Sequence, residues 1–256
     1  MTANVVPPPL LEVRGVTKDF GGLRVLRGVD LTIGSGELRC IIGPNGCGKT
    51  TLFNVITGTL APDAGRVLFR GEDITGEPPH LIARRGIGRK FQVPGIYPTL
   101  SVAENLEVAR LGRRAAARIW ATLAAGPSDA TPTSRLLRQF GLDREALRPA
   151  GTLAHGLKQW CEIAMLESAE AQLLLLDEPT AGMSAAETTA TVELIRRLQR
   201  ERAAAVLVIE HDMSFVRALG CPVVVMLRGT VLFEGSYDQV HAHPEVREAY
   251  LGHAAQ

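Results

Sequence analysis

The stretch GPNGCGKT, residues 43–50, is the most informative motif of this chain, because it follows the pattern G-x-x-x-x-G-K-[ST]. It lies between a short apolar run, ELRCIIG (37–43), and KTTLFNVITGTL, whose apolar residues recur at helical spacing. A strand, a glycine-rich turn and a helix in this order form a loop whose backbone N–H groups surround phosphate oxygens. The pattern predicts that Lys49 reaches the β- and γ-phosphates of a nucleotide and that Thr50 binds Mg²⁺.

The composition is that of a folded protein with no strong charge bias. Of the 256 residues, 46% are hydrophobic and 21% charged, and 28 basic against 27 acidic side chains give a formal charge of +1. No overall field favours nucleic acid or an acidic membrane surface. The longest apolar runs fall far short of the ~20 residues that span a bilayer, and MTANVVPPPL lacks the pattern of a signal peptide. Four scattered cysteines without a C-x-x-C pair weigh against a zinc site or a disulfide framework, so we expect an intracellular protein.

A second chemical motif lies in AQLLLLDEP (171–179), a continuous apolar run that ends in two carboxylates. Such a run is typical of a strand that is buried on both faces. Asp177 at its end could hold Mg²⁺ through water, and Glu178 could polarise the attacking water. The alternative is a pair of solvated acids at a strand end, and the presence of the phosphate loop in the same chain argues against it.

The rest of the chain alternates between strand and helix patterns. LEVRGV (11–16) and LRVLRGVDLTI (23–33) alternate apolar and polar residues, which predicts a small antiparallel sheet, and RVLFRGEDI (66–74) also has strand character. Residues 101–147 are rich in Ala, Leu and Arg and predict helices. A helix at Ala185–Arg202, a buried strand AAVLVIEHD and a hairpin turning near Arg228–Gly229 follow. The pattern predicts an α/β nucleotide-binding core that a helical subdomain interrupts.

A phosphate loop alone does not separate GTPases, kinases and ATPases, although the absence of Asn-Lys-x-Asp weighs against a GTPase. The order of the motifs resembles that of the ATP-binding subunits of ABC transporters, over residues 10–253. The resemblance implies a P-loop ABC ATPase core, with a RecA-like mixed sheet, a small antiparallel β subdomain and an inserted α-helical subdomain. It implies one domain over 10–253, with the core at 10–91 and 160–253, the helical subdomain at 92–159 and an N-terminal arm at 1–9.

The resemblance also implies roles for single residues. Phe20, in TKDFGG, matches the aromatic residue that stacks on adenine, with a core phenylalanine as the alternative. Gln92, in GRKFQ, matches a glutamine that touches Mg²⁺ or the water, and His211, in IEHDM, matches a histidine that binds the γ-phosphate. The expected catalytic residues are Glu178, His211 and Gln92, and the expected Mg²⁺ residues are Thr50, Gln92 and Asp177. The expected nucleotide-binding residues are Phe20, Gly43, Pro44, Asn45, Gly46, Cys47, Gly48, Lys49, Thr50 and Thr51.

Two departures from the common family pattern lie next to these residues. Cys47 stands where Ser is commoner, and it is either a thiol activated at a helix N-terminus or a tolerated small residue. Ser184, in AGMS (181–184), stands where many members have Asp. This second difference would alter the communication between two paired sites.

The largest departure is in LAHGLKQW (153–160), which matches the family signature Leu-Ser-Gly-Gly-Gln. In the family this signature closes over the ATP that the partner subunit holds. Leu153 and Gly156 are retained, Ala154 replaces Ser, Leu157 replaces Gln, and His155 completes the segment. One lost hydrogen bond to a charged group costs about 1.5–3 kcal/mol, roughly ten- to a hundredfold. We therefore expect a weakened signature and an asymmetric pair with a different ATPase.

Further stretches narrow the resemblance within the family. The stretches GIGRKFQVPGIYPTLSVAENLEVA, HGLKQWCEIAML and HPEVREAYLG resemble ATPases of the hydrophobic amino acid uptake group, most of all those of urea (short-chain amide) importers. The alternatives are a branched-chain amino acid importer ATPase and a non-transport or weakly hydrolysing regulatory ABC ATPase.

The resemblance implies ATP and Mg²⁺ as cofactors and a transport complex as the setting. The implied partners are two integral-membrane permeases, a second ABC ATPase or a second copy in a head-to-tail pair, and indirectly a periplasmic or extracellular solute-binding protein. Nucleic acid is not among them. The chain would lie on the cytoplasmic side of the cell membrane as a peripheral subunit.

Overall fold

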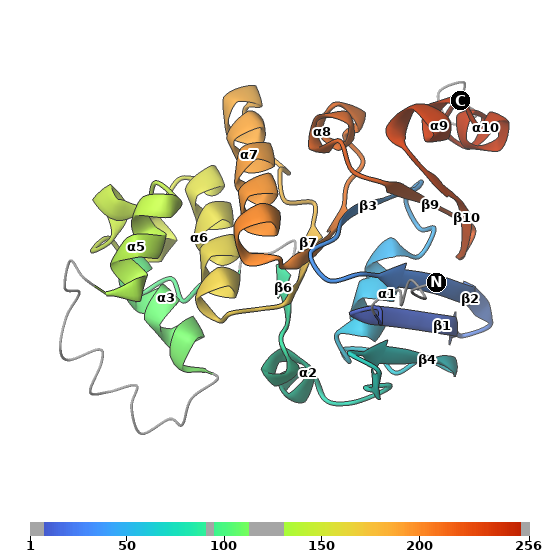
Figure 1. Ribbon diagram of the computed structural model, residues 1–256, viewed down its shortest axis with the longest axis horizontal. Helices are drawn as coiled ribbons and strands as arrows, with labels where there is room; N and C mark the ends of the chain where they lie inside the picture. Colours follow the sequence, from blue (N-terminus) through green and yellow to red (C-terminus); the bar gives the residue numbers. More distant parts are fainter. Residues whose placement is uncertain (1–7, 91–94, 113–130, 252–256) are drawn as a thin grey trace, which may run out of the picture.

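The computed structural model describes residues 8–90, 95–112 and 131–251. The chain begins with a four-stranded antiparallel sheet in the order β2-β1-β4-β5. Its strands are β1 (Leu11–Phe20), β2 (Leu23–Ile33), β4 (Ala64–Phe69) and β5 (Glu72–Asp73). The alternation that the sequence shows becomes one buried and one exposed face, and this sheet confirms the expected antiparallel subdomain (Figure 1).

A six-stranded mixed sheet follows, in the order β10-β9-β3-β8-β7-β6. Its strands are β3 (Leu38–Ile42), β6 (Ile87–Lys90), β7 (Leu173–Asp177), β8 (Ala205–Ile209), β9 (Val223–Leu227) and β10 (Thr230–Gly235). All neighbours are parallel except the hairpin of β9 and β10. Because parallel strands end at the same edge, β3, β7 and β8 bring the chain segments that follow them together.

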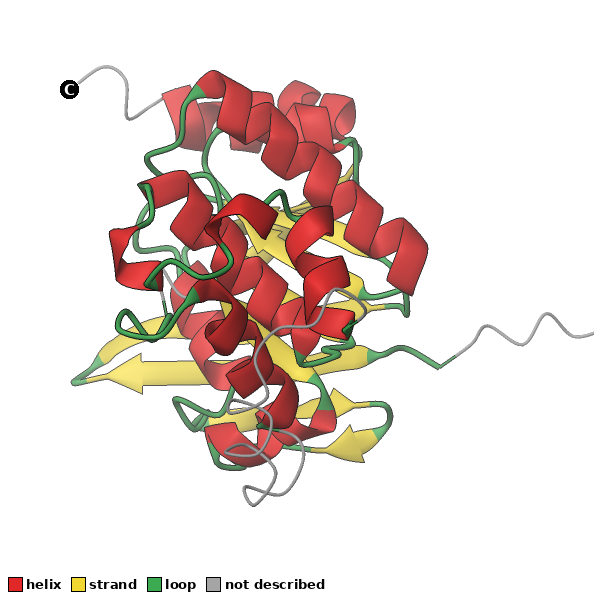
Figure 2. Cartoon of the chain, turned by 90° about the vertical axis from the view of Figure 1, so that its left-hand side faces the viewer, coloured by secondary structure: helices red, strands yellow, loops and turns green. Residues whose placement is uncertain are grey.

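The helices are α1 (Lys49–Ile56), α2 (Pro79–Arg85), α3 (Val102–Leu111), α5 (Pro132–Gln139), α6 (His155–Ser168), α7 (Ala185–Arg202), α8 (Met213–Leu219), α9 (Tyr237–Ala242) and α10 (Pro244–Leu251). Figure 1 shows α3, α5 and α6 grouped at the end of the molecule away from the small sheet, with α7 beside α6. Seen from that end, helices lie in front of the strands (Figure 2). Within the described residues, no helix combines the length and the apolar character that crossing a membrane requires.

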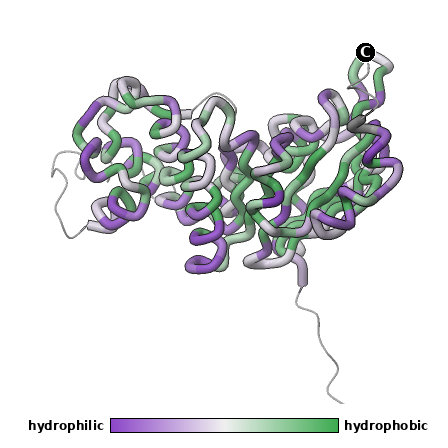
Figure 3. The backbone as a smooth tube through the Cα atoms, turned by 90° about the horizontal axis from the view of Figure 1, so that it is seen from above, coloured by the Kyte–Doolittle hydropathy of each residue, from purple (hydrophilic) through white to green (hydrophobic). Residues whose placement is uncertain are grey.

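The core lies on both faces of the six-stranded sheet. Alternate residues of its central strands join one cluster with α3, α5, α6, α7 and α8, and another with α1 and the small sheet. All five residues of β7 and of β8 are buried, as expected for strands that are covered on both faces. Hydrophobic segments fill the inside of the sheet layers and hydrophilic ones lie outside (Figure 3).

The observed architecture confirms the expected fold class: a mixed α/β sheet, a small antiparallel sheet and a helical part. The expected division at 159–160 stays a prediction. It falls inside α6, which runs without interruption from His155 to Ser168.

Candidate functional site

The phosphate loop, residues 43–50, connects β3 to α1, and close packing explains its glycines. Gly43 has φ +155°, and a Cβ there would lie 2.2 Å from the carbonyl oxygen of Met226 in β9. Gly48, the N-cap of α1, has φ +107°, and a Cβ there would lie 2.8 Å from Cδ2 of Leu26 in β2. Side chains at either position would push the loop away from the strands behind it.

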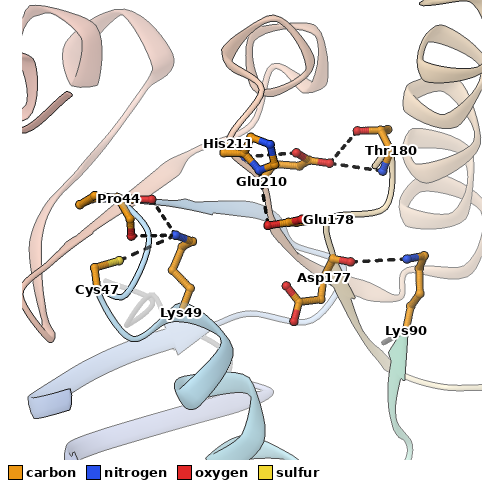
Figure 4. A network of polar contacts seen from close by, with 10 residues as sticks. Pro44, Cys47, Lys49, Lys90, Asp177, Glu178, Thr180, Glu210 and His211 are labelled. Atoms are coloured by element: carbon orange, nitrogen blue, oxygen red, sulfur yellow. Dashed lines mark hydrogen bonds and ion pairs between the residues drawn. The ribbon is translucent and has the colours of Figure 1, made fainter. Parts of the chain in front are cut away.

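Lys49 occupies the inside of this loop. Its side chain is buried, and Nζ donates to the carbonyl oxygens of Gly43 at 2.6 Å and of Pro44 at 3.1 Å. Figure 4 shows the ammonium group enclosed by the loop, with the Cys47 sulfur on the same side. The first turn of α1 contains no acidic residue, so the positive end of the helix dipole is not compensated there. An ammonium group and a helix N-terminus together form a site for an anion.

Cys47 belongs to the loop and is buried, at 4% exposure. Burial raises the pKa of its thiol, and the nearby Lys49 only partly opposes this rise. A helix N-terminus therefore does not activate this thiol, and the structure favours the interpretation of Cys47 as a tolerated small residue.

Asp177, the last residue of β7, is 1% exposed and lies in a pair with a buried arginine. Arg89 Nη2 donates to its Oδ2 at 3.1 Å, and Lys90 Nζ donates to its backbone carbonyl at 3.4 Å (Figure 4 draws the second contact). Burial raises the pKa of the Asp177 carboxyl, and Arg89 opposes this rise. Among the described residues, Oδ1 has no hydrogen-bond partner. A carboxylate oxygen with free lone pairs at the strand end fits a hydrated Mg²⁺ ion.

Glu178 and His211 lie at the ends of the neighbouring strands β7 and β8. His211 Nδ1 is 3.4 Å from Glu178 Oε1, and the Glu178 N–H donates to the carbonyl of Ile209 at 2.9 Å. The backbone of Glu178 is left-handed, with φ +46°. For a residue other than glycine such a conformation costs on the order of 1–3 kcal/mol, and it aims the side chain in a direction that regular backbone does not give. The structure thus brings two of the three expected catalytic residues together (Figure 4).

The third, Gln92, lies outside the described residues. Phe20 lies at the end of β1 and is 44% exposed, so the alternative of a core phenylalanine is wrong. Its ring has Lys18 Nζ at 5.8 Å from the centroid. An exposed aromatic face is available for stacking.

Two buried residues of this site were not assigned a role from the sequence. Glu210, at 2% exposure, accepts from Thr180 Oγ1 at 2.6 Å and from the His211 N–H at 3.1 Å. Arg89, whose Nη1 also donates to Asn54 Oδ1 at 2.6 Å, links α1 to the end of β7. A charged residue within or beside an apolar strand pattern was the available signal in both cases. The partners themselves depend on the order of strands in the sheet.

The segment Leu153–Leu157 lies at the start of α6, which packs on the face of the sheet opposite to α1. Ala154 is the N-cap of α6, and its methyl group cannot accept a hydrogen bond from the first turn. Gly156 is buried, and a Cβ there would lie 2.4 Å from Oε1 of Glu187 in α7. Ser184, by contrast, caps α7: its hydroxyl accepts from the Glu187 N–H, and the Glu187 carboxylate accepts from the Ser184 N–H.

The comparisons with known proteins agree with this geometry. A family described as "ABC transporter" matches residues 26–181, and one described as "Branched-chain amino acid ATP-binding cassette transporter" matches residues 230–256. The chain is 39% identical over 252 residues to the high-affinity branched-chain amino acid transport ATP-binding protein BraF of Pseudomonas aeruginosa, covering 96% of this chain and 99% of that protein. It is 37% identical over 253 residues to the corresponding LivG protein of Escherichia coli (strain K12), with the same coverage of 96% and 99%.

Solved structures give the same picture. The ADP conformation of an ATP-binding cassette of an ABC transporter superposes with a TM-score of 0.81 at 29% identity, covering 95% of this chain and 99% of that one. A nucleotide-free cassette from an ABC transporter also gives a TM-score of 0.81 at 29% identity, covering 94% and 98%.

Proposed function

The chain belongs to the ABC transporter family as an ATP-hydrolysing subunit, and on this premise we propose that it powers an importer of branched-chain amino acids. The names of the relatives BraF and LivG and the family match over residues 230–256 support this solute class. The expectation of urea or short-chain amides, which rested on GRKFQ and HGLKQWCEIAM, is not confirmed, because the matched proteins are named for branched-chain amino acids.

The observation that carries the proposed ATP hydrolysis is that Lys49, Asp177, Glu178 and His211 lie together at one edge of the six-stranded sheet. We propose that residues 43–51 bind the phosphates of ATP and that Phe20 stacks on its adenine. Lys49 would release the carbonyls of Gly43 and Pro44 and turn to the β- and γ-phosphates, because a phosphate oxygen is the stronger acceptor for an ammonium group.

Glu178 would accept a proton from the attacking water, and His211, 3.4 Å from its carboxylate, would donate a hydrogen bond to the γ-phosphate. Thr50 and Asp177, together with Gln92, would hold Mg²⁺, which neutralises charge on the phosphates when it is bound. The left-handed backbone of Glu178 supports this role, because it directs the carboxylate toward His211.

We propose further that the chain works in a head-to-tail pair, in which its segment Leu153–Leu157 covers the ATP of a second ATPase subunit or a second copy. The partners would be two integral-membrane permeases, and the chain would lie on the cytoplasmic side of the membrane. A solute-binding protein would act on the outer side. Residues 92–159 are proposed as the helical subdomain that faces the permeases. Since Ala154 offers no hydroxyl, the partner's site would be the weaker of the two in a heteromeric pair.

The first experiment is purification of the tagged chain from its native cells in mild detergent, with identification of the co-purifying proteins by mass spectrometry. Two polytopic permeases and a second ATPase are expected. A bare homodimer, or soluble partners only, would contradict the importer function.

Uptake measurements then test the solute. Cells that express the native chain should accumulate labelled leucine, and cells that express Lys49→Met should not, because the variant lacks the ammonium group for the phosphates. Glu193→Gln, an exposed position on α7, is the matched control and should transport normally. Uptake of labelled urea, and not of leucine, would move the assignment back to an amide importer.

A further inference from the structure

The start of α6 makes a side-chain contact with the loop that follows Glu178. His155, the first residue of α6, has Nε2 at 2.9 Å from the backbone carbonyl oxygen of Ala181. A carbonyl oxygen only accepts, so this ring nitrogen carries a hydrogen and donates. The contact spans 26 positions in the sequence and joins the signature segment to residues 181–184.

Gly182 and Gln159 contact the imidazole ring of His155 in this position. The ring lies over Gly182, which has φ +74°, and a Cβ at that position would lie 3.3 Å from both Cδ2 and Nε2 of His155. The Gln159 amide, one turn along α6 and buried, lies 3.2 Å from the same nitrogen. The amide atom at this distance is Gln159 Nε2, and a nitrogen that donates to Ala181 cannot accept from it. Exchanging the amide oxygen and nitrogen of Gln159 satisfies the pair.

Two further contacts extend the connection along α6 and α7, which lie side by side in Figure 1. Glu187 Oε1 packs against Gly156, where a Cβ would lie at only 2.4 Å. Trp160 Nε1 donates to Thr191 Oγ1 at 2.9 Å, and this hydroxyl donates to the backbone carbonyl of Glu187 at 2.8 Å. The first two turns of α6 are therefore attached to the first two turns of α7.

The same loop is attached at its other end to the nucleotide site of the chain. Thr180 Oγ1 donates to Glu210 Oε1 at 2.6 Å, and Glu210 Oε2 accepts from the His211 N–H at 3.1 Å. The Ala181 N–H donates to the carbonyl of Glu178 at 3.2 Å. A displacement of residues 181–184 would thus change the positions of both His155 and the Glu178–His211 pair.

We propose that His155 is a positioning residue that links residues 154–157, which face the partner's nucleotide, to the loop 181–184 beside the chain's own Glu178. The inference rests on the proposed function for the meaning of the two sites. Closure of the segment over the partner's ATP then shifts the chain's own catalytic carboxylate. The His155–Ala181 hydrogen bond contributes to this coupling beside the contacts between α6 and α7. The Nε2–H of His155 is donated to Ala181, so this N–H is not free for the partner's nucleotide.

The test uses two substitutions of the same residue. His155→Phe keeps a ring over Gly182 and removes the donor, while His155→Gln restores an N–H near the position of Nε2. Steady-state ATP hydrolysis by the purified complex should show kcat lowered about two- to tenfold in His155→Phe, the range expected for one lost hydrogen bond. The KM for ATP should stay unchanged, and His155→Gln should recover most of the kcat. Glu193→Gln, an exposed substitution on α7, is the control for an effect of any substitution in this helix.

A second measurement does not depend on the proposed function. Amide hydrogen exchange of the isolated chain should be about two- to tenfold faster at Ala181 and Met183 in His155→Phe than in the native chain, with His155→Gln close to native. Equal exchange would overturn the link. Faster exchange with an unaltered kcat would overturn the positioning role, and a raised KM with an unaltered kcat would show a direct nucleotide contact instead. If the native complex hydrolyses no ATP, the proposed function fails, while the exchange result still decides the contact.

Discussion

The starts of α1 and α6 are two helix N-termini of one chain, proposed to face the nucleotides of two different sites, and they are equipped very differently. At α1 a buried lysine, a closely packed glycine loop and the carboxylates at the ends of β7 and β8 surround the place for phosphate. At α6 an alanine stands at the N-cap, and the buried Gly156 and the backbone of the first turn are what remain for an anion. The start of α1 therefore has the charged side chains that the proposed phosphate site needs, and the start of α6 does not.

A helix N-terminus can therefore bind an anion through two separate contributions, its backbone and its side chains. Backbone N–H groups and the helix dipole attract an anion whatever the sequence is. Side chains add hydrogen bonds and cap the helix, and these are lost at Ala154. The neighbouring helix α7 shows the contrast inside the same region, because Ser184 and Glu187 form a complete capping box there.

The largest expected effect is on the α1 side. Glu178→Gln should lower ATP turnover by about 10²- to 10⁴-fold, because the amide cannot accept a proton from the attacking water. ATP binding, measured with a fluorescent ATP analogue, should persist, since the phosphate loop is intact. Inorganic phosphate release gives the rate, with Glu193→Gln as the control. Turnover within a few-fold of the native value would mean that the base lies elsewhere and would remove the main chemical contrast between the two helix starts.

Arg89→Met tests how much the buried ion pair between Arg89 and Asp177 contributes to the stability of the chain. The variant leaves Asp177 without its guanidinium at side-chain exposures of 5% and 1%, and it should cost about 3–5 kcal/mol in the free energy of unfolding. Urea denaturation measures this loss. The double variant Arg89→Met with Asp177→Asn should recover a large part of it, because no uncompensated buried charge is left. A single variant as stable as the native chain would contradict the assigned role of the pair.

Ala154→Ser with Leu157→Gln adds side-chain chemistry to the α6 start. In the assembled complex, ATP turnover should rise by up to roughly ten- to a hundredfold, because a hydroxyl and an amide become available to the partner's γ-phosphate. Ala154→Gly is the matched control, since glycine is tolerated at an N-cap and offers no hydroxyl. An equal rate in the native and double-variant complexes would show that these positions do not limit turnover.

The smallest expected effect is on the cap of α7. Ser184→Ala should lower the free energy of unfolding by about 0.5–2 kcal/mol, and Ser184→Asp should leave it nearly unchanged, because both Ser and Asp accept at an N-cap. Thermal unfolding with matched buffers measures both. If Ser184→Asp changed ATP turnover while its stability stayed native, the serine would affect communication between sites beyond its role as a cap.

A large part of the fold and of the site was predictable from local pattern. The loop 43–50, the strand before it and the helix after it are recognisable because glycine spacing and apolar periodicity are local properties. Asp177 and Glu178 were predictable from a run of apolar residues that ends in acids. The choice between an activated thiol and a tolerated small residue at Cys47 was left open by the sequence, because it depends on solvation, and packing buries this thiol.

From the amino-acid sequence we could predict the residues proposed for phosphate chemistry and the approximate positions of the strands and helices that hold them, but not their exact ends. Three contacts became visible only in the folded chain: Arg89 pairs with Asp177 across 88 positions, Glu210 accepts from Thr180, and His155 donates to Ala181. Such contacts depend on tertiary structure because the energy of a buried charge or a buried hydrogen bond depends on how it is shielded from water. The segments that shield it are distant in the sequence. The order of strands in the sheet and the packing of the helices determine which segments these are, and a local stretch of sequence does not show it.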